Sequence, residues 1–143
     1  MTAKEFLRRT TKIRKEIDEL ENRIKEVRAS YMAPRAIQYD DMPKAHRPTD
    51  LSDYYAHVEI FIDMLLAKEK ELIGVHADIM LTVDRLEDPD ERRVLMLRYI
   101  DRKTWLEISR VIPCSERAVY YLHGRALRHL DEILQSIAVT NHV

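Results

Sequence analysis

The stretch from Lys103 to Leu130 reads KTWLEISRVIPCSERAVYYLHGRALRHL, and its spacing predicts two short helices joined by a tight turn. Thr104 and Glu107 are placed to form a capping box at the start of the first helix, and Pro113 ends that helix. Ser115 is placed to cap the second helix. Apolar residues recur at the positions that two crossing helices bury, namely Ile108, Ile112, Cys114, Val119 and Leu122. This arrangement predicts a helix-turn-helix, a motif that places its second helix in the major groove of DNA.

A third helix is expected directly before this motif. Asp88 is placed to cap it, Pro89 suits its first position, and Glu91 is placed to complete a capping box. The helix is expected to run to about Ile100 and to end in a short polar break. The three helices together predict a tri-helical DNA-binding unit. Glycine usually occupies the turn between the last two helices, so Pro113 at that place is the main departure from the pattern.

The charge of the chain is distributed unevenly. The whole sequence carries −1, with 24 Lys and Arg against 25 Asp and Glu. Residues 92–130 hold nine Lys or Arg and three Asp or Glu, a net charge of +6. The remaining residues hold 15 Lys or Arg and 22 Asp or Glu, a net charge of −7. The basic end favours contact with phosphate, and the acidic remainder indicates a second role.

The second helix of the motif supplies the residues that are expected to read DNA. Ser115, Glu116 and Arg117 lie in its first turn, where Arg117 matches the acceptor edge of guanine and Glu116 can accept a hydrogen bond from cytosine. Further residues expected on its outward side are Tyr120, Tyr121, Gly124 and Arg128. Four basic residues are better suited to phosphates, namely Arg102, Lys103, Arg110 and Arg125.

Each of these interpretations has a structural alternative. A three-helix bundle with the same pattern can bind protein instead of DNA. Tyr120 and Tyr121 can pack against the helical hairpin, and Glu116 can serve only to stabilise the positive end of its helix.

Two long helices are expected before the basic end. Residues 2–32 show a heptad-like seam, which consists of Phe6, Thr10, Ile13, Ile17, Leu20, Ile24, Val27 and Tyr31. Residues 50–86 continue this spacing with Val58, Ile62, Leu65, Leu72, Ile79, Val83 and Leu86. The segment 33–49 contains three prolines and no periodicity, which predicts a loop. The helices are expected to fold back as an antiparallel hairpin, and their wide apolar stripe indicates a further partner, either a second copy or the C-terminal domain.

The predicted fold class is therefore all-α. A long antiparallel, coiled-coil-like helical hairpin is expected over residues 1–87, with a proline-containing connector at 33–49. A helix-turn-helix DNA-binding domain is expected over residues 88–143. Whether the N-terminal seam pairs within one chain or between two chains is left open by the sequence.

Composition argues against several other functions. Cys114 is the only cysteine and is expected in the core, so neither an internal disulfide nor a multi-cysteine zinc site is expected. The six histidines show no metal-type spacing, and neither a glycine-rich phosphate loop nor a catalytic triad is recognisable. No enzyme activity, cofactor or metal is therefore expected. The apolar runs are too short for a membrane span or an export signal, so a cytoplasmic protein is expected.

The stretch DERRVLMLRYIDRKTWLEISRVIPCSERAVYYLHGRALRHL, residues 90–130, resembles region four of bacterial sigma factors. The resemblance is carried by Leu95, Leu97, Arg98, Tyr99, Trp105, Glu107, Ile108, Ser115, Val119, Arg125, Ala126 and Leu127. With the preceding hairpin and the Leu-Glu-Asp-Pro-Asp junction, the chain is similar to small phage and prophage proteins of Gram-positive bacteria. Those proteins are related to autolysin-regulatory and late-gene transcription activators. The resemblance implies a phage-encoded regulator and not a full sigma factor, because no segment resembles the regions that melt promoter DNA.

The expected function is sequence-specific regulation of transcription, with activation of late phage genes in a bacterial host cell. Double-stranded DNA is the expected partner, RNA polymerase a further one, and a homodimer the expected assembly. Two alternatives remain from the sequence. One is a DNA-packaging protein like the small terminase subunits of phages. The other is a protein that binds polymerase or sigma factor without touching DNA.

Overall fold

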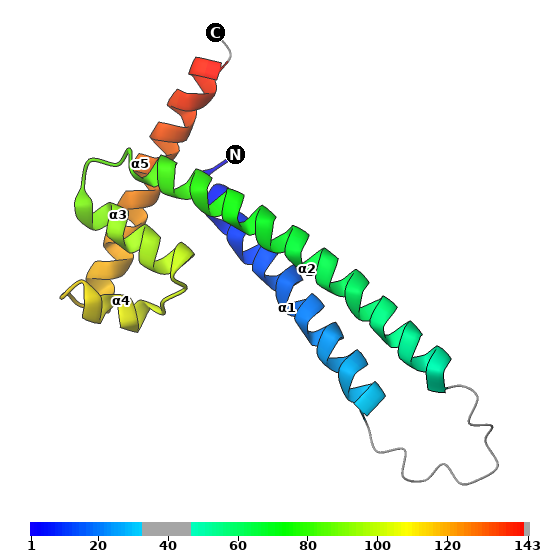
Figure 1. Cartoon of the computed structure of the whole chain (residues 1–143). Coiled ribbons are helices and arrows are strands. Elements are labelled where there is room, and N and C mark those ends of the chain that lie inside the picture. The colour runs from blue at the N-terminus through cyan, green and yellow to red at the C-terminus, as the bar shows by residue number, and fades with distance from the viewer. Residues whose placement is uncertain (33–46, 142–143) are drawn as a thin grey trace. The chain divides into compact units, whose positions relative to one another are not determined.

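The computed structural model describes residues 1–32 and 47–141, and every regular element among them is helical (Figure 1). The elements are α1 (Ala3–Met32), α2 (Arg47–Val83), α3 (Pro89–Leu95), η2 (Met96–Ile100), α4 (Trp105–Val111) and α5 (Glu116–Asn141). The predicted all-α class is thereby confirmed. Most of the predicted connector, 33–46, lies outside the described residues, and α2 begins three residues earlier than expected.

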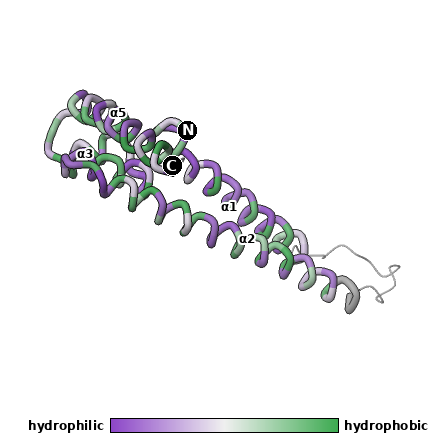
Figure 2. Tube along the Cα trace, turned by 90° about the horizontal axis from the view of Figure 1, so that it is seen from above, coloured by the Kyte–Doolittle hydropathy of each residue, from purple (hydrophilic) through white to green (hydrophobic). Residues whose placement is uncertain are grey.

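Helices α1 and α2 pair as the predicted antiparallel hairpin (Figure 1). Arg9 of α1 lies 3.7 Å from Asp78 near the end of α2. Further along α1, the Glu16 carboxylate lies 2.6 Å from the Lys68 ammonium. Hydrophobic and hydrophilic residues alternate along both helices (Figure 2). The predicted seam residues of α1 are buried as far as Leu20, because an amphipathic helix gains most by turning its apolar stripe toward a neighbour.

The contacts of the chain cluster into two compact units. One unit contains Met1–Lys12 and Leu72–Val143, and the other contains Ile13–Glu71. The beginning of α1 and the end of α2 therefore belong with the C-terminal helices. This grouping differs from the division at residue 87 that the sequence suggested, since helical periodicity alone does not show which part of a long helix packs on which neighbour.

The first unit has a core to which all of its segments contribute. Helices α3, α4 and α5 contribute Val94, Leu95, Ile108, Val119, Ala126 and Leu130, all without exposed surface. The hairpin contributes Ala3, Phe6, Leu7, Ile79 and Val83, and the loop after α2 contributes Leu86. Thr10, the polar residue of the α1 seam, is also buried, and its hydroxyl donates to the Leu7 carbonyl at 3.1 Å and to the Tyr99 carbonyl at 3.4 Å. The hydroxyl is thus satisfied at a seam position whose neighbours along the seam are apolar.

The predicted helix starts are confirmed by hydrogen bonds. The Asp88 carboxylate accepts from the backbone N–H of Asp90 at 2.8 Å, and Pro89 occupies the first helical position. Thr104 accepts from the N–H of Glu107 at 3.2 Å, as its capping box requires. Ser115 accepts from the N–H of Ala118 at 3.1 Å, and the preceding turn contains Pro113. Each cap depends on residues two or three positions apart, which explains why the sequence predicts it.

Three local features differ from expectation. The last turn of the third predicted helix is a π turn, η2, in which the Asp101 N–H donates to the Met96 carbonyl at 3.0 Å. Arg102, which follows, has a φ of 60° in the left-handed region. Cys114 is only half-buried and not fully in the core.

None of the described helices combines the length and apolar character that crossing a membrane requires.

Candidate nucleic-acid interface

The beginning of α5 presents one continuous polar and aromatic face to solvent. Arg117, Tyr121, Gly124 and Arg128 follow one another at helical spacing, and all are exposed. On the opposite side, Val119, Ala126 and Leu130 are completely buried. Burial of one stripe therefore fixes the other stripe outward, in the position from which a recognition helix enters a DNA groove.

Ser115 and Glu116 lie at the N-terminal end of this face and are exposed. The Ser115 hydroxyl caps the helix, as described above. The Glu116 side chain occupies the first turn, where the helix dipole favours a negative charge. Both interpretations of Glu116, as a base-reading group and as a stabiliser of the helix start, fit this place.

The two tyrosines of the face have different surroundings. Tyr120 is 51% exposed, and the centroid of its ring lies 5.0 Å from that of Trp105 at the start of α4. Tyr121 is 68% exposed. Tyr120 is thus braced by α4 with much of its ring open to solvent, and Tyr121 projects outward.

The basic residues predicted to contact phosphate lie at both ends of α4. Arg102 and Arg110 are exposed, and Lys103 is half-exposed. The Lys103 ammonium lies 3.8 Å from the Glu107 carboxylate, one turn along α4, an exposed pair whose stabilising effect is small. These three side chains remain available to an anion outside the protein.

Arg125 has a different environment from the other predicted phosphate contacts. Its guanidinium donates to the Asp88 carboxylate at 2.7 Å and to the Glu91 carboxylate at 2.9 Å. These hydrogen bonds and charges raise the pKa of Arg125, and hydrogen bonds with the N–H groups of Asp90 and Glu91 lower the pKa of Asp88. Arg125 thus joins α5 to the start of α3, and a phosphate contact from it stays a prediction.

Glu91 does not complete the capping box that the sequence suggested. Its carboxylate is 1% exposed and accepts from Arg125, and it lies 2.7 Å from the His129 ring nitrogen Nδ1. The partners lie 34 and 38 residues further along the chain. The carboxylate turns toward α5 because a buried carboxylate needs hydrogen bonds and positive charge nearby. The exposed start of α3 has less need of a further partner.

A basic pocket beside α4 was not recognised from the sequence. It has a volume of about 520 Å³ and is lined by Lys4, Arg8, Thr11, Arg98, Tyr99, Arg102, Trp105 and His123. The Arg98 guanidinium lies over the Trp105 ring, 4.3 Å from its centroid, and donates to the Lys103 carbonyl at 3.0 Å. The Tyr99 hydroxyl lies 2.8 Å from Nε2 of His123. Only Arg102 of this set was among the predicted phosphate contacts.

His123 reports on the electrostatics of this pocket. Burial, followed by the positive charges of Arg98 and Lys4, lowers the pKa of His123 to about 4. The unfolded chain takes up this proton near pH 6.5, so the folded state loses stability as the pH falls from about 6.5 toward 4.

We expect this titration to remove about 1 kcal/mol of stability between pH 7 and pH 4.5, after allowance for partial exposure of the ring. Urea unfolding at the two pH values measures the loss. The variant His123→Gln, which keeps a side chain able to hydrogen-bond Tyr99, should show a smaller loss than the unchanged protein. Equal losses in the two proteins would contradict the assignment to His123.

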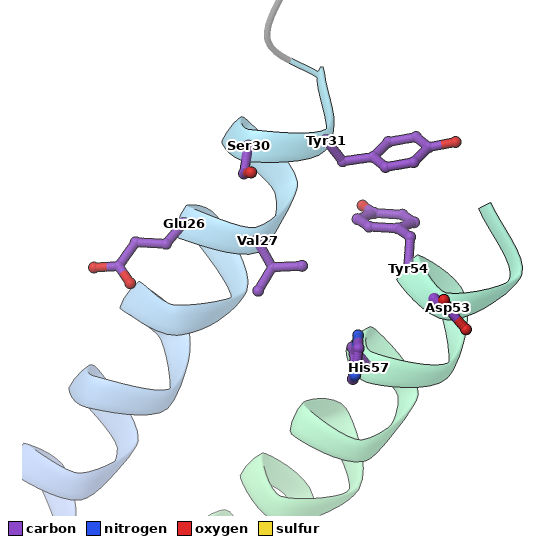
Figure 3. A pocket seen from close by; sticks show the side chains of 7 residues that line it. All are labelled: Glu26, Val27, Ser30, Tyr31, Asp53, Tyr54 and His57. Atoms are coloured by element: carbon purple, nitrogen blue, oxygen red, sulfur yellow. The ribbon is translucent and has the colours of Figure 1, made fainter. Parts of the chain in front are cut away.

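A second pocket lies in the other compact unit, between the paired ends of α1 and α2 (Figure 3). Its volume is about 450 Å³, and the rings of Tyr31 and Tyr54 stack there with centroids 4.4 Å apart. Glu26 and Asp53 line it together with His57. Two carboxylates and no Lys or Arg make this pocket unsuited to phosphate. Among the described residues, no cluster of His, Cys, Asp and Glu has the makings of a metal site.

The fold and the exposed face of α5 define a helix-turn-helix domain. Residues 79–130 match the family described as Sigma-70, region 4. The match includes the end of α2, all of α3, η2 and α4, and the first part of α5. Comparison with curated proteins and with solved structures found no match. A domain of this type favours DNA binding or sigma-related regulation, with DNA and RNA polymerase as the partners of the family.

Proposed function

We propose that this protein is a sequence-specific, DNA-binding regulator of transcription that reads its target through the exposed face of α5. The carrying observation is that Arg117, Tyr121 and Arg128 project from a capped helix whose opposite stripe is buried. The family match over residues 79–130 supports this role. The proposed role is not catalytic and requires no cofactor.

The finer assignment is activation of late genes of a phage or prophage, in the cytoplasm of a bacterial host cell. It rests on the resemblance of the whole chain to regulators of that kind. In this role the acidic hairpin contacts another protein, and RNA polymerase is the proposed partner. Residues 92–130 carry a net charge of +6 and the rest of the chain carries −7. This distribution supports a division of roles, in which the basic segment contacts DNA and the acidic segment contacts protein.

The proposed assembly is a homodimer. Apolar residues of α2 that do not face α1 remain exposed at heptad spacing, namely Tyr55, Ile62, Leu66, Ile73 and Met80. A second copy covers such a stripe by the same pairing rule that joins α1 to α2. Light scattering after size-exclusion chromatography measures the mass: a dimer supports this assembly, and a ring of many copies favours DNA packaging.

The main test is selection of bound fragments from random DNA, followed by affinity measurements on the selected sequence. Replacing Arg117 by alanine should weaken binding by about 30-fold, or about 2 kcal/mol, and relax the preference at one base pair. The control is Arg23→Ala, which removes an exposed arginine from α1 in the other compact unit.

Three outcomes would contradict the proposal. If no sequence is enriched and the unchanged protein binds all DNA equally, regulation by sequence recognition is excluded. If Arg117→Ala behaves like Arg23→Ala on an enriched sequence, α5 is not the reading element. Binding to polymerase without any affinity for DNA would favour the alternative of a protein-interaction domain.

A further inference from the structure

The basic pocket described above joins two segments that lie far apart in the chain. Arg98 comes from η2 and Arg102 from the loop that follows it, both inside the family match. Lys4 and Arg8 come from the first turns of α1, about 90 residues earlier and outside the match. All four belong to the same compact unit, so the packing of that unit sets their positions relative to one another.

The first turns of α1 are held in place by their own contacts. Ala3 has no exposed surface, and its N–H donates to the Asp131 carboxylate of α5 at 2.5 Å. Leu7, which lies between Lys4 and Arg8 in the sequence, is completely buried. The Thr10 hydroxyl donates a hydrogen bond to the Tyr99 carbonyl. Since Lys4 and Arg8 are one helical turn apart, this packing directs both toward the same side.

The pocket has an excess of positive charge that its own residues do not balance. Four cationic side chains line it, and no Asp or Glu does. Within the described parts of the chain, none of the four forms an ion pair with a carboxylate. Burial is the main cause of the low pKa of His123, and the positive charges of Arg98 and Lys4 lower that pKa further, as expected beside an unbalanced cationic cluster. Like charges held together repel one another, so binding of an anion is favourable.

The pocket adjoins the exposed face of α5. Trp105 lines the pocket, and its ring lies 5.0 Å from that of Tyr120. The pocket also lies beside the start of α4, and in helix-turn-helix complexes the helix before the recognition helix crosses the DNA backbone. An anion in the pocket therefore lies next to the surface that meets DNA in the proposed function.

We propose that the pocket formed by Lys4, Arg8, Arg98 and Arg102 binds phosphate groups of the DNA backbone, so that α1 is part of the DNA-binding surface. This inference rests on the proposed function and extends it to residues outside the family match. Its phosphate contacts contribute affinity that does not depend on sequence. Lys4 and Arg8 are exposed, so replacing them leaves the packing of Leu7 unchanged.

The test measures how DNA affinity depends on salt. The double variant Lys4→Gln and Arg8→Gln should lower the slope of log K against log salt concentration by about two. Its affinity should fall by the same factor on preferred and random DNA, with the sequence preference and the melting temperature unchanged. The matched control, Lys15→Gln with Arg23→Gln, removes one lysine and one arginine from exposed positions of α1 beyond the pocket and should leave the slope unchanged.

The results separate this inference from the proposed function. Equal slopes for the double variant and the unchanged protein overturn the inference, even where sequence preference is normal. The inference is also overturned if the double variant and the unchanged protein have equal salt slopes while inorganic phosphate shifts the His123 ring signals in NMR spectra. The pocket then holds a free anion and not the DNA backbone. A reduced slope without any sequence preference upholds the phosphate contacts and removes the regulator. Absence of binding to any DNA overturns both.

Discussion

Replacing Glu91 by alanine should lower the free energy of unfolding by about 3 kcal/mol. The Glu91 carboxylate is 1% exposed and holds Arg125 at 2.9 Å and His129 at 2.7 Å. Its removal leaves the Arg125 guanidinium with Asp88 alone and opens space beside the buried stripe of α5. Because Arg125 also joins α5 to the cap of α3, the loss should appear as lower stability of the whole C-terminal unit. Urea unfolding followed by circular dichroism measures it.

Glu87→Ala is the matched control for this effect. Glu87 is exposed at the same junction, and only its backbone carbonyl takes part in a contact there, accepting from the Arg92 guanidinium at 3.2 Å. An exposed substitution of this kind should change stability by less than about 0.5 kcal/mol. Similar values for the two variants would show that the Glu91 carboxylate does not hold α3 and α5 together.

Replacing Leu7 by alanine should lower the free energy of unfolding by about 3 kcal/mol, the usual cost of emptying a fully buried leucine site. Leu7 has no exposed surface and lies in the segment Met1–Lys12 that packs with the C-terminal helices. Amide hydrogen exchange should therefore become faster in α3 and α5, more than 80 residues away in sequence. This result would show that the helix-turn-helix domain depends on α1 for its stability.

Leu81→Ala provides the control within the same compact unit. Leu81 is 72% exposed, so the same change of side chain should cost less than about 0.5 kcal/mol and leave exchange in α5 unaltered. If Leu7→Ala accelerates exchange in α1 alone, the first turns of the chain do not support the domain.

Local interactions made much of the fold predictable from the sequence. The caps at Asp88, Thr104 and Ser115 act over two or three residues, so their side chains and their targets are read from the same short stretch. The outward face of α5 is equally predictable, because Val119 and Ala126 mark the buried stripe at helical spacing. The antiparallel hairpin follows from two long apolar seams that cannot stay in water.

Two of the features that sequence reasoning missed join distant segments. Glu91 was assigned to its own helix end, whereas the structure turns it toward Arg125 and His129 of α5. The pocket combines Lys4 and Arg8 with residues near position 100, and no local pattern reports that proximity. The π turn at η2 adds a residue to the last helical turn, which periodicity over five residues cannot resolve.

Arg102 illustrates how a residue can be poorly suited to its backbone and well suited to its surroundings. Its φ of 60° is a conformation that glycine adopts freely and that costs an arginine about 1 kcal/mol. Glycine at this position would make the domain more robust to heat and would leave the pocket with one positive charge fewer. The loop after η2 is therefore a place where thermal robustness and attraction for anions are in opposition, and selecting variants for heat resistance alone would tend to erode the second property.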